Sequence, residues 1–312
     1  MTEAGWGAGA TWATGCVLAL FLVGAPIAVA LGASGYILSV ATRAAAFAIA
    51  AVSLQFVLGF GGMVSFGHAA MIGMGAYTVL AAGGADAAWV LPLSAVMGAG
   101  FAALTGVVAL RTRGVTFIMI TLAFGQMAYF VAQALTVFGG DDGATLDGRS
   151  PLFGAPLLDG RFAFHALVVG NLVVLGLLLR GVALSRFGRA LRAARQSEVR
   201  VTALGYDVFR IRLAAYAIGG AGGGMAGFWL ANTSEFVSPA ILDWRGSGTL
   251  LVMVILGSVG ALGRSVDGRL IGAAAGATGL VVMEEALALV TPHGALLLGP
   301  AMVLLALAGR RV

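Results

Sequence analysis

The sequence predicts an all-α, polytopic membrane protein with about ten transmembrane helices, one or two of them broken or re-entrant. Three observations support this fold class. Hydrophobic residues make up 60% of the 312 positions, and charged residues only 10%, whereas a soluble domain carries about 25% charged residues. Long apolar stretches recur along the chain, and the arginines gather in a few of the segments between them. We expect a single transmembrane domain over residues 1–312.

A transmembrane helix needs about 20 apolar residues, and ten stretches reach or approach that length. They are 11–31, 36–58, 64–82, 89–110, 115–138, 162–180, 213–231, 247–262, 270–290 and 294–309. We interpret the first as a retained helix rather than a cleaved signal peptide, because residues 1–11 carry no basic residue. The third is interrupted by glycines and the eighth is short, so these two are the candidates for broken or re-entrant helices.

The distribution of arginine predicts which loops face the cytoplasm. Residues 180–212 hold 8 of the 18 basic residues. With ten spans, the same side also receives Arg111, Arg113, Arg264, Arg269, Arg310 and Arg311, whereas the opposite side keeps only Arg149, Arg161 and Arg245. Basic residues concentrate in cytoplasmic loops. We therefore expect the 180–212 side, with both chain termini, to be cytoplasmic.

The composition excludes several classes of function. The chain contains no lysine, so it has neither a P-loop, which requires Gly-Lys-Ser/Thr, nor a Schiff-base lysine. The single Cys16 cannot form an internal disulfide, and with three scattered histidines it predicts no metal site. The net charge of +5 reflects membrane topology rather than binding to nucleic acid. We expect no catalytic residue and no enzyme activity in this chain.

The loop 181–212 has the pattern of a short amphipathic helix followed by a second one. On a helix over 186–196, Phe187, Ala190, Leu191 and Ala194 form an apolar stripe, and arginines occupy the opposite half. Gly205 stands where a helix over 198–204 needs a left-handed residue to stop. Such a segment either lies on anionic lipid or docks a cytoplasmic partner. The candidate docking residues are Arg186, Phe187, Arg189, Leu191, Arg192, Arg195, Glu198 and Gly205.

Polar residues inside the predicted spans are candidates for a substrate pathway. They are Ser65, His68, Thr121 and Gln126. The alternative for His68 is a core histidine that bonds a freed backbone carbonyl. The alternative for Thr121 and Gln126, and for Ser53 and Gln55 on the second span, is hydrogen bonding between helices.

Two further patterns concern helix packing. Gly219, Gly223 and Gly227 lie four residues apart, a spacing that lets helices approach closely in lipid; a glycine-lined pathway is the alternative. Glu284 and Glu285 fall in the outer third of the ninth span, and our hypothesis is that they pair with Arg43 near the outer end of the second. The external segments 139–161 and 232–246 are candidates for contact with an external partner.

Four stretches resemble, in order, the permease subunits of branched-chain amino acid ABC importers, in the LivM-like branch of that family. They are GFGGMVSFGHAAMIGMGAYTVL (59–80), RGVTFIMITLAFGQM (113–127), the long segment that begins SRFGRALRAARQSEVRVTALGYDVF (185–209), and LVMVILGSVGALGRSVDGRLIGA (251–273). The resemblance covers roughly residues 36–310. One residue and one segment depart from the family pattern. Gln126 stands where the family usually has glutamate. The loop reads SEVRVTALG where family members more often have a pair of alanines followed by an acidic residue.

The resemblance implies a multi-pass permease of the bacterial inner membrane that translocates branched-chain or related amino acids. Its partners would be two cytoplasmic P-loop ATPases, a second homologous permease subunit, an external substrate-binding protein and membrane lipid. ATP and Mg would bind the ATPases, and this chain would bind no cofactor. The alternatives are a urea, amide or small organic acid importer of the same family, or an ion-coupled secondary transporter, for which Glu284 and Glu285 are the candidate carboxylates.

Overall fold

The structure is a computed structural model that describes residues 3–32, 34–258 and 265–290. Six helical stretches in this part are long and apolar enough to cross a membrane. They are α1 (Glu3–Ala30), α2 (Gly35–Gln55) with its π-helical extension η1 (Phe56–Phe60), α4 (Ala87–Ala109), α5 (Val115–Ala134), α6 (Arg161–Leu184) and α11 (Val266–Val290). A seventh long helix, α9 (Val208–Ser234), is rich in glycine and packs against α2, α3 and α4. The all-α polytopic fold is therefore confirmed.

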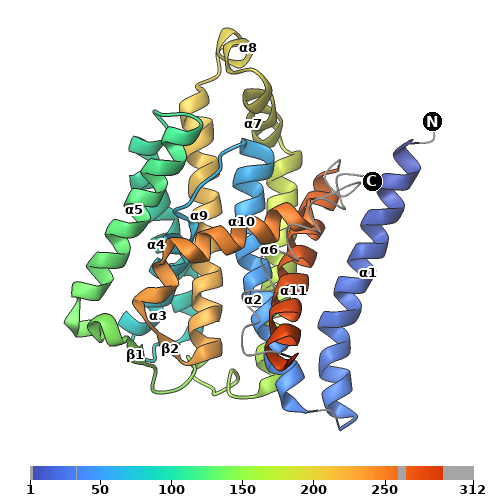
Figure 1. Cartoon of the computed structure of the whole chain (residues 1–312), viewed down its shortest axis with the longest axis vertical. Coiled ribbons are helices and arrows are strands. Elements are labelled where there is room, and N and C mark those ends of the chain that lie inside the picture. Colours follow the sequence, from blue (N-terminus) through green and yellow to red (C-terminus); the bar gives the residue numbers. More distant parts are fainter. Residues whose placement is uncertain (1–2, 33, 259–264, 291–312) are drawn as a thin grey trace.

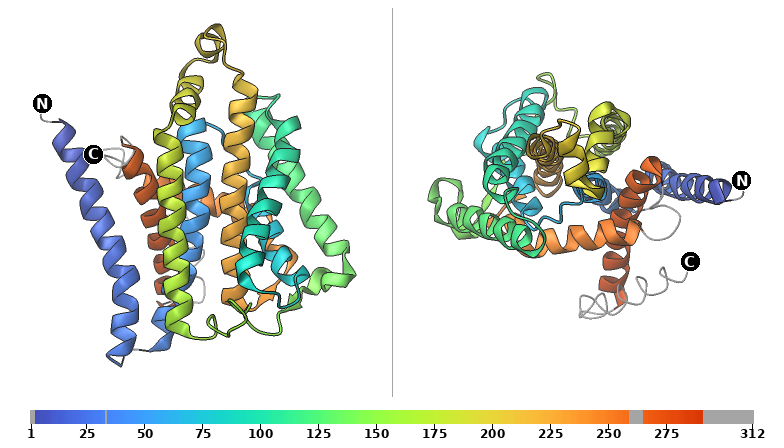
Figure 2. Two further views of the ribbon diagram at one scale, coloured as in Figure 1. Left: turned by 180° about the vertical axis from the view of Figure 1, so that it is seen from behind. Right: turned by 90° about the horizontal axis from the view of Figure 1, so that it is seen from above.

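The two weak spans are short helices. α3 (His68–Ala81) and α10 (Trp244–Gly257) have 14 residues each, and such a helix is about 21 Å long, shorter than the ~30 Å hydrocarbon core. Residues 61–67 leave the end of α2 and descend into the bundle before α3 begins (Figure 1). α10 runs obliquely across the other helices (Figure 2). A broken third span and a short eighth one are confirmed, and the tenth span, 294–309, lies outside the described residues.

Both helices expected in the loop 181–212 are present. α7 covers Arg186–Gln196 and α8 covers Glu198–Ala203, and together they project from one end of the bundle (Figure 1). Gly205 has a φ of 84°, which confirms the predicted left-handed stop. The α4–α5 connection with Arg111 and Arg113, and the start of α1, lie at this same end, which we call the α8 side.

The opposite end, which we call the far side, is closed by loops with little regular structure. They contain the turns η2 (Thr136–Phe138), η3 (Gly140–Asp142) and η4 (Pro239–Leu242). β1 (Ala144–Thr145) pairs antiparallel with β2 (Phe236–Val237), and the Asn232 side chain accepts a hydrogen bond from the backbone of Ser150 at 2.9 Å. Loop 139–160 is thereby fastened to the end of α9.

Asp86 fastens the same loop to α4. One carboxylate oxygen caps α4 by accepting from the Ala88 N–H at 2.9 Å, and the other accepts from the Gly154 N–H at 2.8 Å. Hydrogen bonds from backbone N–H groups, first of all Ala88, lower the pKa of Asp86 because they favour the ionised form.

Glycines let the backbone of α9 come into direct contact with the backbones of α3 and α4. A methyl group on Gly224 would collide with the carbonyl oxygen of Ser94 on α4, and one on Gly227 with that of Ile72 on α3. Gly75 and Gly98 face α9 in the same way. The described helices therefore show that the glycine spacing serves close helix packing, the first of its two interpretations.

Candidate functional site

The apolar stripe of α7 faces the bundle rather than solvent. Leu191 and Ala194 are buried, and Phe187 packs against the hydrophobic core. The structure thus contradicts the expectation that Leu191 offers a contact surface: a partner could reach it only if α7 left the bundle. The stripe anchors the loop.

The arginines of α7 bind backbone carbonyls at the ends of neighbouring helices. Arg189 and Arg192 donate to the carbonyls of Leu184 and Ala183 at the end of α6, both at 2.9 Å, and Arg195 donates to that of Gly59 in η1. The last carbonyls of a helix lack partners within it and attract cations. These three docking candidates therefore also hold α7 in place, whereas Arg186 is exposed.

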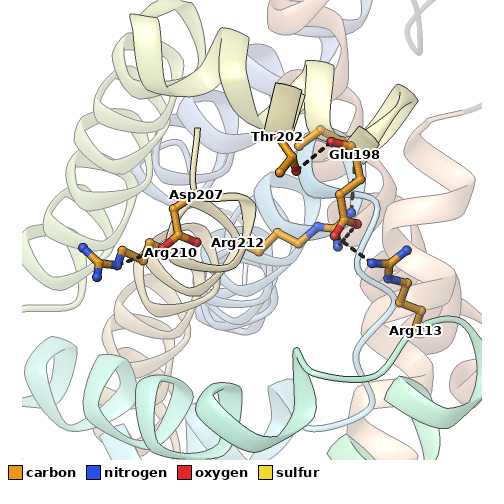
Figure 3. A network of polar contacts seen from close by, with 7 residues as sticks. Arg113, Glu198, Thr202, Asp207, Arg210 and Arg212 are labelled. Atoms are coloured by element: carbon orange, nitrogen blue, oxygen red, sulfur yellow. Dashed lines mark hydrogen bonds and ion pairs between the residues drawn. The ribbon is translucent and has the colours of Figure 1, made fainter. Parts of the chain in front are cut away.

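Glu198, at the start of α8, links three segments of the α8 side. One carboxylate oxygen lies 2.7 Å from Arg113 in the α4–α5 connection, and the other lies 2.9 Å from Arg212 on α9 (Figure 3). Glu198 and Arg212 are largely shielded from solvent, so this contact is stronger than an ordinary surface ion pair. Among the docking candidates, Glu198 points inward and fixes the orientation of α8.

The outermost part of the loop carries exposed apolar side chains instead. Val199 is 81% exposed, Leu204 76% and Tyr206 52%; we call these three residues the α8 tip. Gly205 turns the chain between the last two. Apolar side chains exposed near one another on a projecting segment make it a candidate interaction site. Sequence reasoning missed this surface, because a helix of six residues is too short for a periodic pattern to show which of its side chains, and of those that follow it, are exposed.

The broken third span forms the second candidate region. Irregular backbone at membrane depth needs hydrogen bonds from surrounding protein, and side chains provide them here. Thr121 accepts from the Phe66 N–H at 3.1 Å and Ser65 from the Gly67 N–H at 3.2 Å. Ser247 on α10 accepts from the Ala69 N–H at 2.9 Å. Ser65 and Thr121 lie together at this break and support its backbone.

His68 is the first residue of α3 and is completely buried. Its Nε2 lies 2.8 Å from the Ser53 hydroxyl, which itself lies 2.7 Å from the Ala50 carbonyl. Because that hydroxyl proton goes to the carbonyl, Nε2 carries the proton and donates to Ser53. The partner is thus a hydroxyl on α2, not the expected freed carbonyl. Nδ1 has no hydrogen-bond partner among the described residues.

The expected hydrogen bonds between helices are present for two of the four polar residues considered. Ser53 on α2 contacts His68 on α3, and Gln55 accepts from Ser258 at the end of α10 at 3.4 Å. Thr121 instead bonds the irregular segment before α3. Gln126 differs, because its buried Nε2 has no hydrogen-bond partner in the described part of the chain. Within the part of the chain that the structure describes, no group of three or more histidine, cysteine, aspartate or glutamate residues could hold a metal ion.

Replacing Thr121 with valine is expected to destabilise the protein by about 1 kcal/mol, because the part-buried Phe66 N–H would lose its hydrogen-bond partner. The midpoint of thermal unfolding in detergent measures this effect. Thr121→Ser keeps the hydroxyl and serves as the matched control. Equal midpoints for the two variants would contradict a supporting role of Thr121 at the break.

Comparison with known proteins gives a consistent result for most of the chain. Residues 36–307 match the family described as branched-chain amino acid transport system, permease component. Two similar proteins are the high-affinity branched-chain amino acid transport system permease proteins LivM of Escherichia coli strain K12 and of Salmonella typhimurium strain LT2. Each is 28% identical over 292 residues, which cover 85% of this chain and 67% of the relative.

No solved structure matches the chain. The family match extends from the beginning of α2 past the end of α11, and so includes the broken third span, the Glu198 contacts and the α8 tip. The chain belongs to the family of permease components of branched-chain amino acid transport systems.

Proposed function

We propose that the chain is the transmembrane permease subunit of an ABC importer that carries branched-chain or related amino acids across the bacterial inner membrane. ATP hydrolysis on separate subunits drives the transport, and ATP and Mg bind there. The observation that carries this proposal is the α8 tip: an exposed apolar surface at the end of an arginine-rich loop, in a chain of a permease family.

In this proposal the α8 side is cytoplasmic, in line with its arginines, and two P-loop ATPases bind there. Residues of the α8 tip contact the ATPase, and the Glu198 contacts with Arg113 and Arg212 transmit its movement to α9 and to the α4–α5 connection. The docking arginines Arg189, Arg192 and Arg195 position α7 through their carbonyl contacts, and the exposed Arg186 is available to the ATPase. A second, homologous permease subunit completes the membrane part, and an external substrate-binding protein contacts the far side at 139–161 and 232–246.

An ion-coupled secondary transporter would need a carboxylate free in the core of the bundle to bind the coupling ion. Glu284 and Glu285 instead lie 3.9 and 3.7 Å from Arg43 and are partly exposed, and such a transporter has no use for an apolar tip outside the membrane. Both observations favour the ATP-driven importer.

Reconstitution in liposomes tests the proposal. The complete complex, with both permease subunits, both ATPases and the binding protein, is expected to accumulate radiolabelled leucine when ATP is supplied, and to stop when ATP is withheld. Uptake that needs no ATP and follows an imposed ion gradient would contradict the importer mechanism. Uptake of urea but not of leucine would show that the importer carries urea rather than amino acids.

A further inference from the structure

Three arginine side chains from two helices converge on one helix end on the α8 side. Arg195 of α7 and Arg269 of α11 both donate to the carbonyl of Gly59 in η1, the second at 2.7 Å. The guanidinium carbons of Arg192 and Arg269 lie 5.9 and 5.6 Å from the centre of the Phe60 ring, within the range of a cation–π contact. We call Arg192, Arg195 and Arg269 the arginine cluster.

The charge of this cluster calls for an anion from outside the chain. Among the described side chains, no carboxylate lies within 4.0 Å of Arg192 or Arg195. Segments 259–264 and 291–312 contain no aspartate or glutamate. Like charges that share one acceptor repel each other, and an anion between them relieves the repulsion. Acids of the same end pair with other arginines: Glu198 with Arg113 and Arg212, Asp207 with Arg210, and Asp267 with Arg180.

The cluster has hydrogen-bond donors available for that anion. A guanidinium group carries five N–H donors in a planar fork that fits phosphate or carboxylate oxygens. Within the described part of the chain, Arg192 and Arg195 each donate one hydrogen bond, to the carbonyls of Ala183 and Gly59. Arg195 is exposed, and Arg192 and Arg269 are partly exposed. An anion can therefore reach the cluster without any movement of α7.

The position of the cluster indicates which anion it meets. η1, α6 and α11 belong to candidate membrane spans, and Gly59, Ala183 and Arg269 lie within three residues of the ends of these elements. The cluster is thus at the membrane surface, where phospholipid phosphate groups lie. α6 exposes Leu177 and Leu184, so acyl chains border this helix up to the same level. The α8 tip lies farther out than α7 (Figure 1).

We propose that the arginine cluster binds the phosphate group of an anionic phospholipid. Arg192 and Arg195 donate to the phosphate, Arg269 adds a third positive charge beside it, and the acyl chains lie along α6. A bound lipid then neutralises the cluster and holds α7 against η1 and α11. The site makes the position of the loop that carries the α8 tip sensitive to lipid composition, which goes beyond the proposed transport function.

Amide hydrogen exchange of the complete wild-type complex tests the site without any mutation. Nanodiscs of phosphatidylcholine are compared with nanodiscs that also contain phosphatidylglycerol. We expect phosphatidylglycerol to slow exchange in 56–62 and 186–196, because the bound lipid holds these segments together. Equal exchange in the two membranes would overturn the proposal. Inorganic phosphate added to the phosphatidylcholine nanodiscs is expected to have no effect, and slowing equal to that by phosphatidylglycerol would assign the site to free phosphate instead.

Paired substitutions test which residues bind the lipid. Arg195→Gln with Arg269→Gln removes two charges but keeps amide donors for the Gly59 carbonyl. Its affinity for phosphatidylglycerol, measured from the rise in the thermal midpoint of the complex during titration, is expected to fall about tenfold or more, because charge-assisted hydrogen bonds to phosphate are lost. Arg195→Lys with Arg269→Lys keeps the charges and should retain most of the affinity. Arg111→Gln with Arg200→Gln is the matched control, since both residues are exposed outside the cluster.

Three results with these variants would overturn the proposal. The first is wild-type affinity for phosphatidylglycerol in the cluster glutamine variant. The second is an equal loss in the control variant, which would indicate diffuse attraction to the whole loop. The third is a cluster variant that loses the ATPases while its lipid affinity is unchanged, which would assign the cluster to carboxylates of the ATPase. None of these measurements uses transport, so their failure is distinguishable from failure of ATP-driven uptake.

Discussion

Replacing Gly224 with alanine is expected to prevent correct packing of the bundle. The added methyl group would collide with the carbonyl oxygen of Ser94, so α9 and α4 would have to separate along their contact. Overpacking of a tight contact costs about 1–3 kcal/mol or more, and here rigid backbone rather than a flexible side chain must move. We expect a large loss of monodisperse protein in fluorescence-detected gel filtration, together with rapid cleavage by trypsin.

Gly176→Ala is the matched control for this prediction. Gly176 lies in α6, and a methyl group there would meet no atom of the described chain within 4 Å. Alanine favours a helix by about 1 kcal/mol over glycine, so this variant is expected to be as stable as the wild type. If both alanine variants gave the same yield of folded protein, close packing of α9 would not be what requires glycine at residue 224.

Replacing Val199 and Leu204 together with aspartate is expected to lower ATP-driven uptake by about tenfold or more, because buried apolar anchors contribute most of the energy of an interface. Both side chains are exposed, so the isolated permease should remain folded. The measurement combines leucine uptake in proteoliposomes with the amount of ATPase that co-purifies.

Val137→Asp provides the control for the tip, since Val137 is 85% exposed but lies in η2 on the far side. We expect it to retain the ATPases and uptake. A Val199 and Leu204 variant that retained both would show that the α8 tip is not the docking surface. Leu191→Asp, by contrast, should reduce folding itself, because Leu191 is buried beneath α7.

The helices were largely predictable from the sequence, because lipid makes hydrophobicity a direct guide to position. Apolar length located the spans, and the period of the loop located α7 and the start of α8. The contact of Arg43 with Glu284 and Glu285 was also correct. This pairing was predictable from the depth of the residues in the membrane, since charged residues at the same depth on neighbouring helices have few other partners.

The packing of α7 was predicted less well, for a physical reason. A helical wheel shows that α7 has an apolar stripe but not what covers it. The stripe of Leu191 and Ala194 is covered by the bundle, and the neighbouring arginines bind helix-end carbonyls that no sequence pattern reveals. The hydrogen bonds of Ser65, Thr121 and Ser247 to the broken span were equally hidden, because they join residues far apart in the chain.

α9 has a mechanical consequence. It runs without proline for 27 residues, about 40 Å. Arg212 near its first end contacts Glu198 of α8, and Thr233 and Ser234 at its other end line a cavity of about 310 Å³ together with Arg43. Because glycines bring α9 into backbone contact with α3 and α4, a displacement that enters at α8 reaches the other end of α9 only if α3 and α4 move with it.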